Sequence, residues 1–314
     1  MLRTRLRTRP SPSVASRPSR LLCADARGVG VASRRDGECV VVYTAAAMTT
    51  NAGVLETSIL GVVQGLTEFL PISSDGHLAL GQRILRTGGH LEMTVLLHAG
   101  TLLATLLVFR KEVLGLFKEL AAVVKAPSRL KTDPVAMEGL GVVIASVPTA
   151  VIGLLLKKRV EAWSNVSWIV AVCFLGTGLV LLASRLGKER EDFRWTPTRA
   201  FLLGLAQGAA VLPGLSRSAC TIATALLLGA PPKDAFRFSF LVSLPAVGGA
   251  LLLELKDPGA LTRAGGTAGI IGAVVAFFVG LVALYALRGV VSRGRLWVFA
   301  IYVIPLAILT FVLG

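Results

Sequence analysis

The chain has 314 residues, of which 54% are hydrophobic and only 16% charged, and its mean hydropathy is +0.72. A soluble domain carries about 25% charged residues, so the composition excludes an ordinary soluble enzyme and predicts an all-α protein that crosses a membrane several times. The net charge of +15 lies in an N-terminal leader and in short connections between apolar runs. It forms no basic stripe with interleaved aromatic residues, so we expect no nucleic-acid partner.

Residues 1–47 form a leader that differs from the rest of the chain. It contains nine arginines and no lysine, is rich in Ser and Pro, and lacks the long apolar segment of a secretory signal peptide. The composition suits an organelle transit peptide, and equally an upstream stretch translated from a start codon placed too early; we favour the second, with Met48 as the start. In either case we expect residues 1–47 to be disordered and outside the fold, and residues 48–314 to form a single membrane domain.

Six later segments are long and apolar enough to cross a hydrocarbon core about 30 Å thick. They are residues 93–109, 137–156, 166–185, 236–254, 267–287 and 296–313. Residues 54–86 and 199–230 differ, because "FLPISSDGH" and "VLPGLSRSACT" interrupt them and leave halves too short to span. Non-helical backbone persists at membrane depth only where protein or a wet cavity surrounds it. Each region is therefore predicted to be a re-entrant helix hairpin.

The two interrupted regions resemble each other. "GVVQGLTEFLPISS" begins at residue 61 and "GLAQGAAVLPGLSR" at residue 204, and both read G-x-x-Q-G followed by Leu-Pro. The similarity predicts an internal duplication, and broken helices at matching positions of two repeats point to a site between them. Basic residues favour the side reached by the first span by about two to one, which places that side in the cytoplasm. The first hairpin then opens outward and the second inward, as an inverted repeat requires.

The first break carries residues that suit a phosphate group. Ser73 can cap the next half-helix, whose N-terminus attracts anions. Ser74 and His77 are three residues apart and share a helix face, which allows a nucleophile and a proton-transfer partner. Gln64 and Glu68 are four apart and offer an amide oxygen and a carboxylate, a modest site for a hard divalent cation.

The second break is built around Arg217, the only charged residue in the apolar part of its hairpin. A guanidinium there needs an anionic partner, and a phosphate bound through two hydrogen bonds fits. Ser216, Ser218 and Thr221 can add hydroxyl donors. Either set alone could be structural, since hydroxyls often only satisfy helix backbones, but their occurrence at matched breaks favours function. His98 suits a site role and a packing role equally.

The two motifs, "QGLTEFLPISSDGH" and "PGLSRSACT", closely resemble the signatures of the bacterial undecaprenyl-pyrophosphate phosphatase family, also described as bacitracin-resistance proteins. The resemblance runs from about residue 54 to the C-terminus. One departure is Ala219, where the second signature usually has glycine. The residues that match the family's motifs are Gln64, Glu68, Ser73, Ser74, His77 and Arg217.

The resemblance implies a multi-pass protein of the bacterial plasma membrane with two interdigitated inverted repeats. It implies hydrolysis of the long-chain lipid undecaprenyl pyrophosphate to undecaprenyl phosphate, which recycles the carrier for cell-wall synthesis. It also implies a site that opens to the periplasmic side and holds a divalent cation, Mg²⁺ or Ca²⁺. Within that site Gln64 and Glu68 would hold the cation, and Glu68, Ser74, His77 and Arg217 would be catalytic.

The sequence leaves two nucleophiles open. Ser74 can attack with His77 as base, or His77 can attack to give a phosphohistidine; we favour Ser74, with Arg217 neutralising the phosphoryl oxygens. Acid-phosphatase-like lipid phosphatases are excluded, since they need His and Asp where this chain has Ala223 and Leu227. A transporter that flips the lipid phosphate is the rival from another class. The oligomeric state, a homo-oligomer included, stays open.

Overall fold

The computed structural model describes residues 31–35, 38–42, 53–85, 87, 91–164, 166–254 and 264–313. The chain divides into two units, Met1–Thr50 and Asn51–Gly314, and each is described by itself. In the first unit, strands β1 (Val31–Arg35) and β2 (Glu38–Val42) pair antiparallel, with Val31 opposite Val42. These two strands fall within residues 1–47, and the other residues of the leader lie outside the described ranges. The expectation that the leader is disordered and outside the membrane domain stays a prediction.

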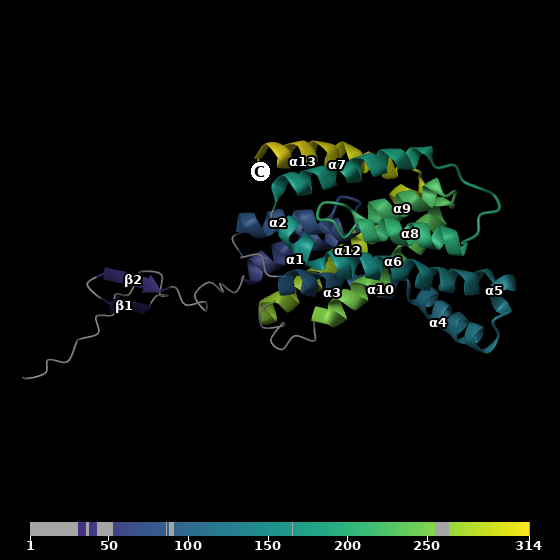
Figure 1. Ribbon diagram of the computed structural model, residues 1–314, viewed down its shortest axis with the longest axis horizontal. Helices are drawn as coiled ribbons and strands as arrows, with labels where there is room; N and C mark the ends of the chain where they lie inside the picture. Colours follow the sequence, from purple (N-terminus) through teal and green to yellow (C-terminus); the bar gives the residue numbers. More distant parts are fainter. Residues whose placement is uncertain are drawn as a thin grey trace, which may run out of the picture. The chain divides into compact units, whose positions relative to one another are not determined.

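The second unit consists of helices in the described ranges, and most of its helices fall into two similar series (Figure 1). The first series is α1 (Val54–Phe69), α2 (Ser74–Leu85), α3 (Leu91–Val108), α4 (Arg110–Lys125), α5 (Arg129–Thr132), α6 (Pro134–Trp163), α7 (Ser167–Ala183) and η2 (Ser184–Leu186). The second is α8 (Pro197–Ala209), α9 (Arg217–Leu227), α10 (Pro232–Glu254), α12 (Gly266–Ser292), η3 (Leu296–Phe299) and α13 (Ala300–Leu313).

The membrane spans agree with the sequence analysis. Five described helical segments are long and apolar enough to cross a bilayer, and the bent pair α3 and α4 would make a sixth. Each of the six predicted spans falls on one of these segments, namely on α3, α6, α7, α10, α12 or η3 with α13. The all-α polytopic fold is thereby confirmed. Residues 110–125 were expected only as a basic connection, whereas they form helix α4.

Both predicted hairpins are present. The longest of their four half-helices, α1, has 16 residues, or about 24 Å at 1.5 Å per residue, which is less than the roughly 30 Å needed to span. The helices are interrupted between Phe69 and Ser74 and between Ala209 and Arg217, the two places where the sequence has Leu-Pro or Leu-Pro-Gly. The halves of each hairpin contact each other, α1 with α2 and α8 with α9.

The two series exchange partners. Helix α1 packs along α12, and its counterpart α8 packs along α6. The repeated G-x-x-Q-G motif explains this packing, because a side chain at Gly61 would clash with the carbonyl of Gly272, and one at Gly204 with the carbonyl of Ala145. Each first half-helix thus lies against a long helix of the other series, as expected for interdigitated repeats. The breaks of both hairpins are consequently held close to each other.

Candidate active site

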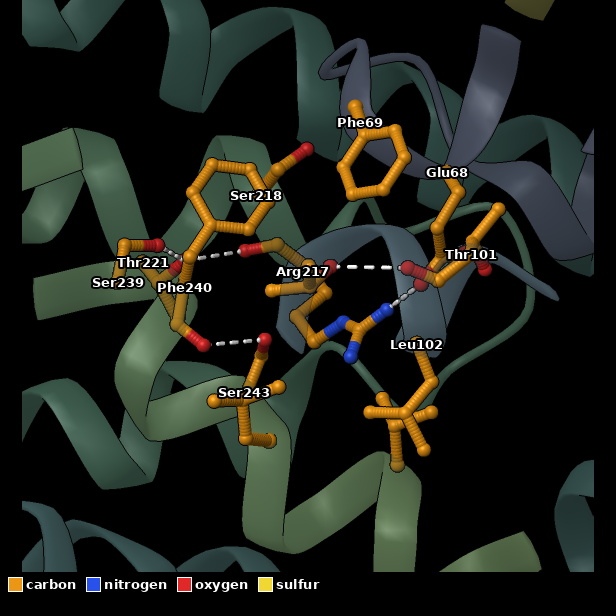
Figure 2. Close-up of a pocket in the computed structure, with 13 residues that line it drawn as sticks. Glu68, Phe69, Thr101, Leu102, Arg217, Ser218, Thr221, Ser239, Phe240 and Ser243 are labelled. Atoms are coloured by element: carbon orange, nitrogen blue, oxygen red, sulfur yellow. Dashed lines mark hydrogen bonds and ion pairs between the residues drawn. The ribbon is translucent and has the colours of Figure 1, made fainter. Parts of the chain in front are cut away.

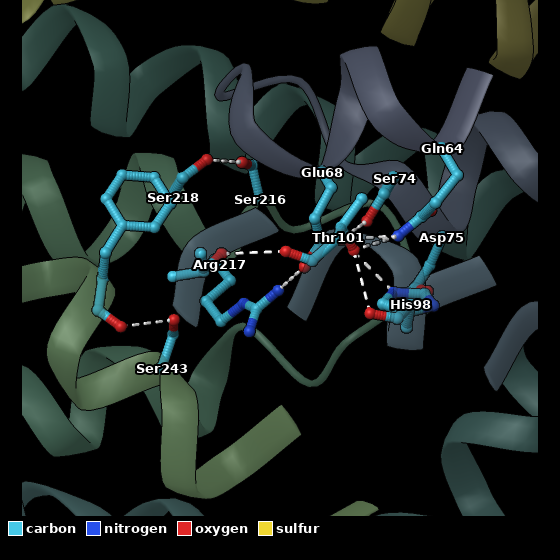
Figure 3. A network of polar contacts seen from close by, with 12 residues as sticks. Gln64, Glu68, Ser74, Asp75, His98, Thr101, Ser216, Arg217, Ser218 and Ser243 are labelled. Atoms are coloured by element: carbon cyan, nitrogen blue, oxygen red, sulfur yellow. Dashed lines mark hydrogen bonds and ion pairs between the residues drawn. The ribbon is translucent and has the colours of Figure 1, made fainter. Parts of the chain in front are cut away.

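Glu68, in the last turn of α1, is the centre of a polar cluster that joins the two hairpins (Figure 3). One carboxylate oxygen, Oε1, accepts a hydrogen bond from Nη2 of Arg217, the first residue of α9. The other, Oε2, accepts from the Ser74 hydroxyl at 2.7 Å and from the Gln64 amide at 3.1 Å. The side chain of Glu68 is only 6% exposed. A buried carboxylate requires such compensation, because an unpaired charge is costly away from water.

The first break positions Ser74 by a sharp reversal of the chain. Ser73 adopts φ +70°, a left-handed conformation that is uncommon for residues other than glycine. Ser74 is then the first residue of α2, and its hydroxyl reaches back to Glu68, six positions earlier. The carbonyl of Ser73 accepts from the backbone N–H of His77. A strained residue directly before the predicted nucleophile is typical of functional sites.

The second break positions Arg217 through a fixed loop. Gly214 has φ +99°, and a Cβ there would lie 2.5 Å from the Val170 carbonyl, so only glycine fits. The buried Thr177 hydroxyl of α7 donates to the Gly214 carbonyl and accepts from the Ser216 N–H, both at 2.9 Å. Ser216 in turn caps α9 by accepting from the Ala219 N–H at 3.3 Å. The loop before Arg217 therefore has little freedom to move.

His98 belongs to the cluster, which the sequence analysis left open. Its Nε2 lies 3.3 Å from Glu68 Oε2 and 3.8 Å from Asp75 Oδ1, and its Nδ1 lies 2.8 Å from the Thr94 carbonyl. Both ring nitrogens thus face acceptors, an arrangement that only a doubly protonated imidazole satisfies with two donated hydrogen bonds. His98 and Arg217 then surround one carboxylate with two positive charges.

His77 lies apart from this cluster. Its Nδ1 is 2.8 Å from the Ser73 carbonyl and its Nε2 is 2.8 Å from the Tyr302 hydroxyl of α13. The ring stacks on Tyr302 and meets the edge of Phe174. Ser74 and His77 share α2, as predicted, but the Ser74 hydroxyl donates to Glu68. The structure does not bring His77 to Ser74 as a base, and its role stays a prediction.

A cavity of about 350 Å³ opens beside the cluster. Ligand sites commonly range from about 300 to 1,000 Å³. Both breaks contribute polar groups, and α10 supplies an apolar wall. The polar lining residues are Thr67, Glu68, Ser73, Ser74, Asp75, Thr94, His98, Thr149, Gln207, Ser216 and Arg217, and the α10 residues are Ala246, Val247, Ala250 and Leu251. An anionic headgroup fits the polar end and an alkyl chain fits the α10 wall.

A second pocket is also lined by Glu68 and Arg217, together with residues of α3, α9 and α10 (Figure 2). Its volume is about 20 Å³, enough for roughly one water molecule. Two of the predicted phosphate-binding hydroxyls, Ser218 and Thr221, line this pocket, whereas Ser216 lines the large cavity. The hydroxyl of Thr221 is hydrogen-bonded to Ser239. The three predicted phosphate-binding hydroxyls are therefore divided between the two pockets.

The predicted cation ligands do not form a ready-made site. Glu68 is already surrounded by donors, and the Gln64 amide turns its nitrogen, not its oxygen, toward Glu68. The Gln64 Oε1 is buried, without a hydrogen-bond partner in the part of the chain that the structure describes. Among the same residues, no group of three or more His, Cys, Asp or Glu could hold a metal ion. As arranged here, these residues do not fit a divalent cation.

Five polar residues of the cavity wall were given no role from the sequence: Thr67, Asp75, Thr94, Thr149 and Gln207. The amide nitrogen of Gln207 donates to the Thr149 hydroxyl and to the Val242 carbonyl, both at 3.2 Å. Its Oε1 is buried and unpartnered among the described residues, like that of Gln64. Gln207 could have been recognised from the repeated G-x-x-Q-G motif, which was interpreted only as a sign of duplication. Gln207 is the counterpart of Gln64 in the second series.

The fold and site define a class of integral membrane protein in which two broken-helix hairpins bring a carboxylate, a serine and an arginine to one buried cavity. The family described as "Bacitracin resistance protein BacA" matches residues 57–309, and the chain belongs to this family. The resemblance inferred from the two motifs is thus confirmed.

Several curated relatives are similar over almost their whole length, and each is named undecaprenyl-diphosphatase. The protein of Desulforapulum autotrophicum is 38% identical over 268 residues, which cover 82% of this chain and 96% of that protein. The protein of Korarchaeum cryptofilum is 41% identical over 263 residues, covering 82% of this chain and 98% of the relative. That of Syntrophotalea carbinolica is 40% identical over 252 residues, covering 79% and 94%.

Proposed function

We propose that the chain is an undecaprenyl-diphosphatase, which hydrolyses undecaprenyl diphosphate to undecaprenyl phosphate and inorganic phosphate. The reaction would recycle the carrier lipid for cell-wall synthesis and contribute to bacitracin resistance. The observation that carries this proposal is the contact of Ser74, Glu68 and Arg217, from two separate breaks, in the wall of one cavity. The printed names of the relatives support it. They give no support to the transport alternative.

The geometry favours Ser74 as nucleophile and Glu68 as the acceptor of its proton. The Ser74 Oγ–H already points at Glu68 Oε2, 2.7 Å away. In the proposed step the serine oxygen bonds the terminal phosphorus, the phosphoanhydride bond breaks, and undecaprenyl phosphate leaves. The serine proton passes to Glu68. Water then attacks the phosphoserine, and its protons leave with inorganic phosphate. As the bond between phosphorus and the Ser74 oxygen breaks, Glu68 returns its proton to that oxygen, so both the hydroxyl and the carboxylate are restored.

In this mechanism Arg217 pairs first with Glu68 and then with the diphosphate of the substrate. In the structure it pairs with Glu68, whereas the incoming diphosphate offers oxygens that a guanidinium binds through two hydrogen bonds. Transfer of Arg217 from the carboxylate to the phosphate would free Glu68 to accept the proton. The same contact stabilises charge on the transferred phosphoryl group. His98 stays beside Glu68 and limits the cost of moving its positive partner away.

A divalent cation, Mg²⁺ or Ca²⁺, is expected only together with substrate. Because the protein ligands do not fit the ion alone, phosphate oxygens would have to complete its coordination. No step above depends on it. Chelation and readdition of each metal test this expectation.

We also propose that the protein lies in the bacterial plasma membrane with its site open to the periplasmic side. The distribution of basic residues supports this orientation, since α4 and the other connections on the opposite, cytoplasmic side carry the larger share of them. Labelling of single cysteines from the two sides of intact cells would test it.

The function is tested by phosphate release from a long-chain polyprenyl diphosphate, using the purified full-length protein in detergent. We expect release by the wild type and its loss in Ser74→Ala and Arg217→Ala. Ser58→Ala is the matched control, because within the described residues that hydroxyl bonds only the Val54 carbonyl, on the exposed side of α1. Folded wild-type protein that binds the lipid without releasing phosphate would overturn the proposal.

A further inference from the structure

Helix α4 leaves the bundle in a direction that suits the surface of a membrane. It meets α3 at Phe109, and the two axes differ by 77°. Helix α3 is apolar and has 18 residues, about 27 Å at 1.5 Å per residue, so it crosses almost the whole hydrocarbon core without α4. A helix at 77° to it then runs along the bilayer surface instead of through it. Figure 1 shows α4 and α5 at the end of the bundle opposite α2.

One side of α4 is fixed to α6. Leu116 is buried, and Leu120 lies against Gly139 of α6. Glu119 forms an ion pair with Arg129 at 3.0 Å, next to the start of α6. These contacts fix the rotation of α4 about its own axis. The faces that it presents to its surroundings are therefore defined.

A second side of α4 is an exposed apolar ridge. Leu114 is 60% exposed, Phe117 67% and Val124 83%. Their spacings of three and seven residues place them on one face of the helix. Exposed apolar surface of this kind marks contact with another apolar phase.

A stripe of lysines runs beside the ridge. Lys111, Lys118 and Lys125 are seven residues apart, so they follow one another along almost the same line of the helix. All three are exposed, and no ion pair engages them within the described residues. Glu112 and Glu119 belong to a different line and leave the stripe uncompensated. An apolar ridge with a cationic edge is the pattern of a helix that lies in a bilayer interface.

We propose that α4 is an interfacial helix that binds the headgroups of anionic phospholipids. Leu114, Phe117 and Val124 enter the outer part of the acyl chains, and the lysine stripe contacts lipid phosphates, its alkyl stems extending along the ridge. Each lysine near an anionic surface strengthens such attraction about fivefold. The site is separate from the catalytic cavity and selects lipid by charge.

The proposal is tested by spin labels on the full-length protein in vesicles of phosphatidylcholine, with or without phosphatidylglycerol. Cys23 and Cys39 are replaced by serine, and the buried Cys173 and Cys220 are kept. The label is placed at Phe117→Cys or at Gly115→Cys, and the protein without either new cysteine gives the background labelling. Position 117 lies on the ridge, and a side chain at 115 meets open space, so both substitutions should fold. Accessibility to oxygen reports the acyl region and accessibility to a water-soluble nickel complex reports water.

We expect the label at 117 to be several-fold more accessible to oxygen than to nickel, and the label at 115 to show the reverse. Phosphatidylglycerol in the vesicles should move the label at 117 deeper into the bilayer, which raises its accessibility to oxygen relative to nickel. Replacing the three lysines by glutamine should abolish that shift, and replacing them by arginine should preserve it. Equal water access at 117 and 115 would overturn the proposal. Protection of the label at 117 from both reagents would also overturn it, because that result indicates a protein partner. So would a membrane depth of this label that is the same with and without phosphatidylglycerol.

Discussion

Thr177→Val tests how strongly the loop before Arg217 depends on one buried hydroxyl. Valine keeps the shape of threonine but cannot bond the Gly214 carbonyl or the Ser216 N–H, which Thr177 contacts at 2.9 Å each. Leaving a buried backbone group unsatisfied costs about 1–3 kcal/mol, so two such groups predict a loss of about 2–6 kcal/mol in the free energy of unfolding. The loop would also lose the contact that fixes its position against α7.

The assay combines an unfolding titration in detergent with phosphate release at a temperature where the variant is folded. Thr310→Val is the matched control, because in the part of the chain that the structure describes that hydroxyl bonds only the Leu306 carbonyl of its own helix. We expect a loss below about 1 kcal/mol in the free energy of unfolding there. Thr177→Ser, which keeps the hydroxyl, should recover most of the activity. Wild-type stability and activity in Thr177→Val would refute the view that α7 fixes the position of Arg217.

Three further predictions concern other parts of the structure. His77→Ala should lower kcat, measured as steady-state phosphate release, by less than the ~10²–10⁴-fold typical of a lost general base. A loss within or above that range would indicate that His77 is the base. Gly214→Ala should lower the free energy of unfolding by about 2 kcal/mol or more, because of its positive φ and the nearby carbonyl. Gly289→Ala should leave the free energy of unfolding nearly unchanged, because a Cβ there has no described atom within 4 Å. Equal effects of the two substitutions would contradict the strain argument. Glu138→Gln should lower the free energy of unfolding by about 2–3 kcal/mol, because Arg237 loses its bidentate partner. The loss is smaller than for a fully buried ion pair, since Arg237 keeps some solvent contact. An unchanged free energy of unfolding would count against this prediction.

The architecture could be predicted from the sequence because its signals are local. Long apolar runs specify spans, and Pro, Gly and Ser within two of them specify breaks. The duplicated G-x-x-Q-G motif predicted the repeat, and the structure explains it by close helix packing. Strands β1 and β2 and helix α4 were not predicted, because the basic composition of their segments was taken to indicate a leader and a connecting loop. In α4 the apolar and basic residues alternate at helical spacing, a pattern that was there to be tested.

The site could be predicted only in part. The sequence identified Glu68 and Arg217 as ionisable residues at matched breaks, and the structure pairs them. Spacing along α2 joined Ser74 to His77, but a shared helix face does not determine which neighbours each side chain meets across a break. The left-handed turn at Ser73 directs the serine to Glu68, while Tyr302 holds the histidine elsewhere. Contacts between distant helices decide such pairings.

The most direct test of the proposed mechanism is to identify the phosphorylated residue. The protein is mixed with a polyprenyl diphosphate labelled in its terminal phosphate, quenched within one turnover, digested and sequenced by mass spectrometry. The proposed mechanism predicts acid-stable label on Ser74, absent in Ser74→Ala and retained in His77→Ala. Acid-labile label on His77, or phosphate release by Ser74→Ala at the wild-type rate, would contradict it.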